Sequence, residues 1–576
     1  MPNPRSAWRG QPLGYWLLLA FAVCMYASGL GGHYIPRNGD EMVYAHIARL
    51  TAATGHWLPL ASELENMRNT KPPLLFWQAM VAGNWGNHWT LAALRLPSLV
   101  YTLLVTAGIV LVVQRLSRDL RLGLLAGVIY LAFFCTFRYG RPYLTSAAES
   151  FWFNLPVAIL LLRHARGLEA NKLLTWPLAL LFGLCFATGL LYKSFALIAP
   201  SGVCLALVAW WLARPANLRA YCALGLKLAC ACALALGIFA LWFAIDPDPQ
   251  AVWREFILFE NASKMNGSQG YWRRALWSDS SIWLQLLAYV QNAGLLGIMV
   301  LALMLWGLRQ GWNTWRGVVN DQSNSLPHAI PALYLWAMLG CLLVWLAIFT
   351  VPSQRSARYV IPASPFLAIL LALLWHRLSK IWFFISFLPN VIAIWLLFAI
   401  GFAAFQMGVA NEFEWLIILF FTSISVMALL LGCLPRFTRP ALLVACVSVL
   451  ATFNAVVAPL DASAASFTQE HSAQWRGKRI AVPSGFNGQF ERYQFVLPSN
   501  HYVPHADGAT PEALLAQFDG VFWLGKDAPA CVAAATCSVV GTRWDMRSRH
   551  ASGEITLGNI ARPQEWLFQR EWLISR

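Results

Sequence analysis

Long apolar stretches recur along the first 460 positions of this 576-residue chain. A stretch of about eighteen or more apolar residues can cross roughly 30 Å of hydrocarbon as a helix. Read in windows of about nineteen residues, the pattern predicts thirteen spans. They lie near positions 14–31, 94–114, 121–137, 147–164, 174–191, 194–213, 221–245, 284–308, 330–352, 357–375, 381–407, 412–433 and 440–459. The chain is therefore predicted to be an all-α polytopic membrane protein over residues 1–460.

The connections between these spans alternate in charge. Every second connection carries arginine or lysine: Arg115, Arg118, Arg121, Arg163, Arg166, Lys172, Arg214, Arg219, Lys227, Arg309, Arg316, Arg377, Lys380, Arg436 and Arg439. These connections fall on the same side as the basic N-terminal segment, and cytoplasmic loops are enriched in such residues. We therefore expect a cytoplasmic N-terminus and, with an odd number of spans, a C-terminus outside. The first span is expected to be an uncleaved anchor, because no small-residue cleavage site follows it.

Three polar stretches face outward under this topology: a first outer loop over 32–93, a second outer loop over 246–281, and a tail over 461–576. The tail alternates four strand-like runs (RIAVPSG, RYQFVLP, GVFWLG and SVVGTRW) with one helical stretch, TPEALLAQF. Short runs rich in β-branched and aromatic residues are typical of strands. The tail is therefore predicted to be a small α/β domain outside the membrane.

Composition agrees with the membrane prediction. Hydrophobic residues make up 58% of the chain and charged residues 12%, whereas soluble domains carry about a quarter charged residues. The formal net charge is +16, but the basic residues are scattered along the chain. This spread argues against nucleic-acid binding and favours anchoring at anionic membrane lipids, together with phosphate recognition outside.

The cysteines divide into two groups. Ten of the twelve lie inside apolar runs, where cysteine behaves as a small hydrophobe. Cys531 and Cys537 lie in the polar tail with five residues between them. This spacing suits a local disulfide if the tail faces an oxidising compartment, and two free thiols are the alternative.

The first outer loop carries the densest polar signal. Asp40 and Glu41 follow the first span, and Lys71 precedes Pro72 and Pro73. Adjacent acids at the mouth of a span can act as a general base or bind a divalent cation. A lysine before two prolines has a restrained backbone, which suits a fixed charge facing a phosphate. The alternative is an interfacial loop with snorkelling charges.

An acid pair after the first span, followed about thirty residues later by Lys-Pro-Pro-Leu, resembles the GT-C glycosyltransferases that use polyprenyl-phosphate sugars. The sequence is most similar to the lipid A aminoarabinose transferases, and the protein O-mannosyltransferases are more distant. The resemblance implies a GT-C fold with a periplasmic C-terminal domain, in a bacterial inner membrane. Its architecture covers nearly the whole chain, whereas its motifs are chiefly Asp40, Glu41 and residues 71–74.

The resemblance also implies roles for single residues. Asp40 matches the aspartate of the family's first loop, a base or acceptor-positioning group, with Glu41 beside it. Lys71 matches the lysine that contacts the carrier phosphate. The family has a second acid in the next outer loop, but residues 138–150 contain no aspartate, and Glu149 is the only acid there. Glu149 with a longer side chain, or a different handling of the acceptor, would explain this departure.

Further basic residues complete the implied site. Lys193, at the outer end of the fifth predicted span, resembles a family lysine, and a snorkelling anchor is the alternative. Arg355, Arg358 and Tyr359 resemble the family's signature of basic residue, tyrosine and proline. Arginine matches phosphate oxygens in bidentate geometry, so these residues are expected to bind the donor phosphate. The second outer loop resembles a mobile loop that closes over the donor.

The implied reaction moves a sugar, 4-amino-4-deoxy-L-arabinose or a similar one, from a polyprenyl-phosphate carrier such as undecaprenyl phosphate to lipid A with inversion. A surface glycan or a protein hydroxyl is the alternative acceptor, and a lipid or solute transporter or a membrane scaffold the alternative class. No cofactor is required, although a divalent cation beside Asp40 stays open. The spacings of His33, His46 and His56 fit no compact metal site.

Overall fold

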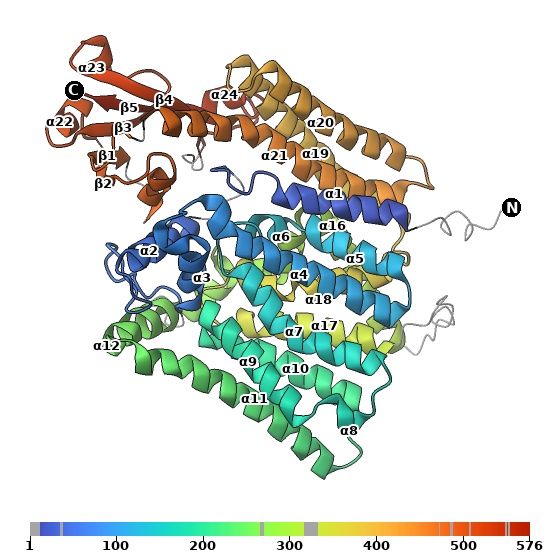
Figure 1. Ribbon diagram of the computed structural model, residues 1–576. Helices are drawn as coiled ribbons and strands as arrows, with labels where there is room; N and C mark the ends of the chain where they lie inside the picture. The colour runs from blue at the N-terminus through green and yellow to red at the C-terminus, as the bar shows by residue number, and fades with distance from the viewer. Residues whose placement is uncertain are drawn as a thin grey trace.

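Each apolar segment expected to span the membrane contains a helix in the computed structural model. The structure describes residues 12–34, 39–264, 270–315, 332–471, 473–483, 488–505, 508–547, 550 and 553–576. The helices lie side by side in a bundle, and a small sheet stands at one end of it (Figure 1). The predicted fold class, a helical membrane bundle with a small C-terminal α/β domain, is confirmed.

The long helices of the bundle follow the predicted segments closely. They are α1 Leu13–Ala27, α4 Leu91–Ser117, α5 Leu120–Ala132, α7 Ser146–Ala165, α9 Trp176–Tyr192, α10 Ile198–Ala213, α11 Leu218–Ile245, α16 Gly297–Trp315, α17 Ala332–Thr350, α18 Ser364–Leu374, α19 Lys380–Gln406, α20 Glu412–Gly432 and α21 Thr438–His471. Within the described residues, nine helices are long and apolar enough to cross a membrane, and three shorter ones are apolar. The chain is a multi-pass membrane protein, and the count of thirteen spans stays a prediction.

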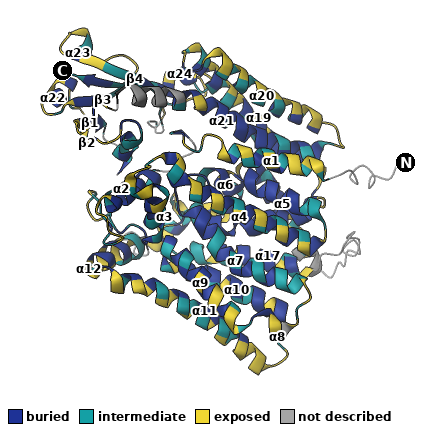
Figure 2. Cartoon of the chain, in the orientation of Figure 1, coloured by how far each residue is buried: buried dark blue, intermediate teal, exposed yellow. Residues whose placement is uncertain are grey.

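Burial in the bundle separates a packed centre from a lipid-facing surface. Every residue of α18 is buried, whereas α19, α20 and other outer helices expose large apolar side chains such as Leu388, Phe420 and Leu430. Figure 2 shows exposed residues in yellow along outer helices such as α11 and α20. Apolar side chains that face outward can contact the lipid tails of the membrane without cost, because lipid tails are as apolar as leucine.

Short helices at the ends of the bundle build its outer loops and connections. In chain order they are α2 Asp40–Ala53, α3 Leu74–Ala82, η1 Asn84–Gly86, α6 Phe134–Tyr139, α8 Ala170–Leu173, η2 Phe195–Leu197, α12 Pro249–Val252, the π-helix η3 Trp253–Asn261, η4 Ala262–Lys264, α13 Tyr271–Trp277, α14 Ile282–Leu286, α15 Ala288–Ala293, η5 Gly294–Leu296 and η7 Ala357–Ala363. The helices of the first outer loop, α2 and α3, lie at the same end of the bundle as the sheet (Figure 1). The segment MVYAHIARL forms the middle of α2.

The C-terminal domain is a five-stranded mixed sheet with short helices. Its strands are β1 Arg479–Pro483, β2 His501–His505, β3 Gly520–Gly525, β4 Ser538–Met546 and β5 Phe568–Ser575, and its helices are η8 Gln489–Phe495, α22 Pro511–Leu515, α23 Ala530–Ala533 and α24 Pro563–Trp566. The order is β2-β1-β3-β5-β4. Strands β2, β1 and β3 are parallel, and β5 runs antiparallel to both of its neighbours. The helix α21 leads from the membrane bundle toward this domain without a break up to His471.

Three features of the tail differ from the sequence-based prediction: one predicted strand is absent, and strands β2 and β5 lie outside the predicted runs. The run RYQFVLP is wrong as a strand, because its first residues belong to the 3-10 helix η8, which buries Tyr493 against the sheet. Strand β5 escaped prediction because the charged pair Arg570 and Glu571 interrupts its apolar pattern. Glu571 is fully buried and pairs with Arg543 and Arg492. Strand β5 therefore lacks the apolar–polar alternation typical of a strand, because one of its inward-facing residues belongs to a buried charge network.

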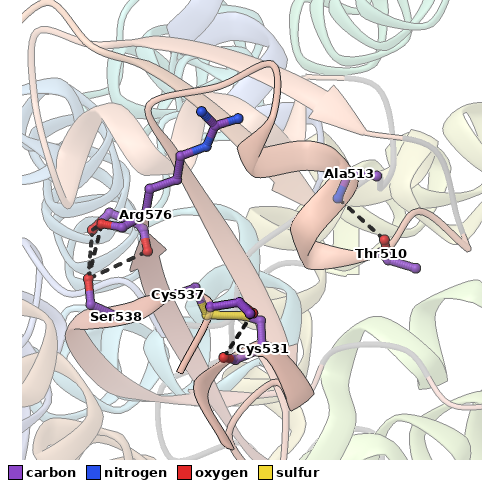
Figure 3. Close-up of a disulfide and its surroundings, with 8 residues drawn as sticks. Thr510, Ala513, Cys531, Cys537, Ser538 and Arg576 are labelled. Atoms are coloured by element: carbon purple, nitrogen blue, oxygen red, sulfur yellow. Dashed lines mark hydrogen bonds between the residues drawn. A yellow bond between two sulfur atoms is a disulfide. The ribbon is translucent and has the colours of Figure 1, made fainter. Parts of the chain in front are cut away.

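The two cysteines of the tail form the predicted disulfide. Cys531 is bonded to Cys537 across the turn that joins α23 to β4 (Figure 3). The backbone amide of Thr536 donates to the carbonyl of Cys531 at 2.9 Å and tightens the same turn. The alternative of two free thiols does not hold.

Candidate functional site

The acid pair that opens α2 separates into two different environments. Asp40 is partly exposed, and its Oδ2 accepts hydrogen bonds from both terminal nitrogens of Arg358, each at 3.0 Å. Glu41 turns the other way and is 1% exposed. Successive residues of a helix point about 100° apart, so adjacent acids rarely share one task.

Glu41 is held in a closed hydrogen-bond network. Its Oε1 accepts from Arg95 Nε at 2.7 Å and from the backbone amide of Tyr143 at 2.7 Å, and its Oε2 accepts from Arg95 Nη2 at 2.9 Å. Arg95 Nη1 also donates to the carbonyls of Leu30 and Gly32. This network fastens α2 to the start of α4, so the geometry gives Glu41 an anchoring role and leaves Asp40 as the accessible acid.

Glu41→Gln is expected to lower the free energy of unfolding by about 3 kcal/mol, because it leaves the buried guanidinium of Arg95 without its counter-charge. The matched control is Glu169→Gln, which removes the acid of an exposed pair with Lys172 and should change stability by less than about 1 kcal/mol. Thermal unfolding in detergent measures both. Equal effects of the two substitutions would contradict the anchoring role of Glu41.

Lys71 is fixed where the first outer loop enters α3. Its Nζ donates to Glu260 Oε1 at 2.6 Å and to the carbonyl of Thr70 at 2.7 Å, and lies 5.7 Å from the centre of the Tyr44 ring. The residue is only 7% exposed. An ammonium group has three donors, and these contacts use two of them. Lys71 is therefore positioned to give another hydrogen bond to an anion that enters the site.

Glu149 and Lys193, the next two predicted site residues, pair with each other. Glu149 lies buried in the first turn of α7, and Lys193 follows the last turn of α9. Lys193 Nζ donates to Glu149 Oε1 at 3.2 Å and to Thr145 Oγ1 at 3.1 Å. Burial lowers the pKa of the Lys193 ammonium, Glu149 raises it, and the cations Arg358 and Lys71 lower it further. The charges of these residues therefore act on one another within one site.

Arg355, which lies just before η7, and Arg358 and Tyr359 within η7 have different surroundings. Arg355 is 4% exposed and donates to the carbonyls of Thr350 and Ser280 and to the Tyr271 hydroxyl. It thereby ties the second outer loop to the segment between α17 and η7. Arg358 faces Asp40, and the ring of Tyr359 packs on Phe349, with 5.4 Å between the ring centres. Among the predicted phosphate ligands of this segment, Arg358 is the one that the geometry brings to Asp40.

The second outer loop packs against the first. Asn69 donates to Glu255 Oε2 through its backbone amide at 3.0 Å and its side chain at 3.2 Å. Ser194, next to Lys193, donates to Asn261 Oδ1 at 2.9 Å. With the Lys71–Glu260 pair, these bonds place the π-helix η3 over Lys71, where the resemblance predicted a loop that covers the donor.

The C-terminal domain also contacts α2. His46 Nδ1 lies 3.0 Å from Glu491 Oε2, and Arg49 pairs with both oxygens of that carboxylate. The amide of Glu63 donates to His46 Nε2, so the neutral ring carries its proton on Nδ1. Gly488 has φ 77° and lies against Val43, where an added Cβ would come within 3.0 Å of the backbone. The helix that begins with Asp40 is thus braced from both sides.

Several residues of the site were missed by sequence reasoning. Arg95 left a signal, since an ionisable residue inside an apolar span is costly and usually has a task. Glu491 left none, because 445 residues separate it from His46. Over the described parts of the chain, no group of three or more His, Cys, Asp or Glu residues is arranged to hold a metal ion.

Comparison with known proteins places this arrangement in context. The chain is 27% identical over 368 residues to the undecaprenyl phosphate-alpha-4-amino-4-deoxy-L-arabinose arabinosyl transferase 1 of Sodalis glossinidius (strain morsitans), covering 63% of this chain and 59% of that protein. It is 26% identical over 343 residues to the corresponding transferase of Aeromonas salmonicida (strain A449), covering 58% and 55%. The chain thus spans less than three fifths of the length of each of these relatives. No family model matches the sequence.

Solved structures give the same answer for the fold. The crystal structure of ArnT from Cupriavidus metallidurans bound to undecaprenyl phosphate superposes with a TM-score of 0.55 at 14% identity, covering 97% of each chain. The apo structure of the same protein gives a TM-score of 0.57 at 15% identity, covering 91% of this chain and 95% of that one. Identities this low establish the fold alone, and the curated relatives add the kinship in sequence. The chain is therefore similar in sequence to these arabinosyl transferases and shares the fold of the ArnT structures.

Proposed function

We propose that this protein is a glycosyltransferase that moves 4-amino-4-deoxy-L-arabinose from undecaprenyl phosphate to lipid A. The observation that carries the proposal is the cluster of interacting charges at one end of an ArnT-like bundle, in which Asp40 meets Arg358 and Glu149 meets Lys193. In the proposed topology this end faces the periplasm, with the N-terminus in the cytoplasm of a bacterial inner membrane. The names of both curated relatives contain the same carrier and sugar.

Lys71 is the proposed main contact of the carrier phosphate. It now pairs with Glu260, and an arriving phosphate would meet the remaining donor of its ammonium group. Lys193 and Arg358 add positive charge nearby, because Arg358 and Lys71 both lower the pKa of Lys193. Fixed cations in a site shielded from water stabilise the negative charge that grows on the phosphate as the glycosidic bond breaks.

Asp40 is the proposed base. Arg358 holds its Oδ2, so Oδ1 is available to accept a proton from the attacking oxygen of the acceptor, or to orient that oxygen if it is already ionised. Direct attack on the anomeric carbon, with the carrier phosphate as leaving group, inverts its configuration. Glu149 keeps Lys193 in place, so in this account a glutamate supplies the second acid of the family pattern by pairing with a lysine.

The test uses purified protein in nanodiscs with undecaprenyl phosphate-aminoarabinose and one acceptor at a time: lipid A, a surface glycan or a peptide with serine and threonine. Mass spectrometry is expected to find the sugar on lipid A. A product on another acceptor would keep the enzyme class and overturn the acceptor. A parallel assay with a chelator tests whether a divalent cation is needed. If the chelator abolishes transfer and one added metal restores it, a metal ion acts beside Asp40. A donor left intact with every acceptor, with and without added metal, would contradict the proposal.

A further inference from the structure

A polar cavity of about 360 Å³ borders the Asp40–Arg358 pair. Residues of α6, α14, α15 and η7, with the turn before α14, line it. Its polar side chains include Arg138, Asp279, Gln285 and Arg358. Its volume lies in the range of pockets that hold small molecules, roughly 300–1,000 Å³. Of these four residues, only Arg358 has a role in the proposed reaction.

Gln285 is the unusual member of this lining. Its side chain is 2% exposed, yet neither Oε1 nor Nε2 has a hydrogen-bond partner in the described part of the chain. Buried polar groups in folded proteins are nearly always paired, and an exception calls for an explanation. Because the residue lines the cavity, the simplest partner is a molecule that occupies the cavity and bonds both ends of the amide.

The chemistry of the lining selects among such molecules. A hydroxyl or amino group can donate to Oε1 and accept from Nε2, whereas a phosphate only accepts and would leave Oε1 unpaired. The carboxylate of Asp279 at the exposed rim can accept a hydrogen bond from a hydroxyl or amino group. Arg355, which lines the cavity too, already donates to Thr350, Ser280 and Tyr271. The cavity is therefore suited to a ligand with several neighbouring hydroxyl or amino groups.

Aromatic side chains complete this wall. Phe134 and Tyr139 line the cavity, and the guanidinium of Arg138 lies 5.7 Å and 5.4 Å from the centres of their rings. Arg138 has no carboxylate partner among the described residues. A few convergent polar groups beside aromatic faces are typical of pockets that fix the orientation of a small polar ligand.

We propose that this cavity is the subsite for the sugar ring of the lipid-linked donor, in which Gln285 reads two adjacent polar substituents and Asp279 a third. The inference rests on the proposed function and deepens it, because it adds sugar-specificity residues beyond those that bind the carrier phosphate. Arg358 belongs both to this cavity and to the ion pair with Asp40, so a sugar bound here lies beside the reacting groups.

The test measures equilibrium binding of two lipids, undecaprenyl phosphate and undecaprenyl phosphate-aminoarabinose, to the full chain in nanodiscs without acceptor. Gln285→Met keeps the volume and removes both hydrogen-bonding ends. It is expected to lower the affinity for the sugar-carrying lipid roughly 10- to 30-fold, which corresponds to the loss of about two hydrogen bonds. The affinity for the bare carrier should stay within about twofold of the wild-type value. Gln250→Met, at an exposed glutamine of α12, is the matched control and should change neither affinity.

A second variant guards against misfolding. Asp279→Asn, at an exposed position, should lower the affinity for the sugar-carrying lipid alone, by about threefold to tenfold. Equal weakening of both lipids in both variants would indicate a phosphate site and overturn the sugar subsite, as would unchanged affinity for both. If the variants show the predicted loss of affinity but the wild-type protein never transfers the sugar, the subsite is supported and the proposed function is refuted.

Discussion

Asp40→Asn is expected to reduce kcat for sugar transfer by about 10²- to 10⁴-fold, the usual contribution of a positioned general base. Asparagine has nearly the same shape and can still accept a hydrogen bond from Arg358 through its oxygen, but it cannot take a proton. Binding of the lipid-linked donor should therefore change little. Single-turnover assays of the reconstituted protein separate the chemical step from binding.

The control for this substitution is Glu65→Gln, at an exposed acid of the same outer loop. It removes an equal charge and should leave kcat within about twofold, because isolated surface charges act weakly across water. An unchanged kcat in Asp40→Asn would show that Asp40 does not act as the base. The same loss in Glu65→Gln would mean that the overall charge of the loop, and not a base at α2, controls the rate.

Lys71→Ala is expected to lower kcat/KM for the lipid-linked donor by about 10²- to 10³-fold, as removal of one fixed donor at a developing oxyanion does. The substitution also removes the cation that pairs with the carboxylate of Glu260, where the phosphate is proposed to bind. Affinity for undecaprenyl phosphate alone should fall as well, which distinguishes this prediction from that for Asp40. Lipid binding and steady-state transfer measure the two effects.

Lys478→Ala provides the comparison for Lys71, because this lysine is exposed on the C-terminal domain and lies 3.9 Å from its acidic neighbour Asp519. It should alter neither binding nor transfer. Lys71→Arg keeps the charge and should restore part of the phosphate affinity. Unchanged affinity for undecaprenyl phosphate in Lys71→Ala would show that the carrier phosphate binds elsewhere.

Much of the fold could be predicted from sequence because hydrocarbon imposes a simple rule. Any segment that crosses it must be long, apolar and helical, and each predicted segment contains a helix. The tail follows weaker rules. Strand β5 was missed because Glu571 and Arg570 interrupt its apolar pattern, and Glu571 is tolerated in the core only through Arg543 and Arg492. Such compensation between distant residues leaves no local pattern.

The site was predictable as a set of residues, and less so as a set of roles. Residue types and spacing singled out Asp40 and Glu41 together, but they cannot tell which of two adjacent acids turns inward. That choice depends on Arg95, which lies 54 positions away and meets Glu41 only in the folded chain. The same holds for Gln285, since nothing in its neighbours indicates that its buried amide would stay unpaired.

The central claim is that this chain uses a lipid-phosphate sugar as donor and releases the carrier phosphate as it transfers the sugar. The most direct measurement counts both products in one reaction of the wild-type protein in sealed proteoliposomes with lipid A present, by mass spectrometry, alongside tracer flux. The account predicts one undecaprenyl phosphate released for each sugar transferred, with both lost in Asp40→Asn and Lys71→Ala. Lipid or solute flux with no donor consumed would contradict it and favour a transporter.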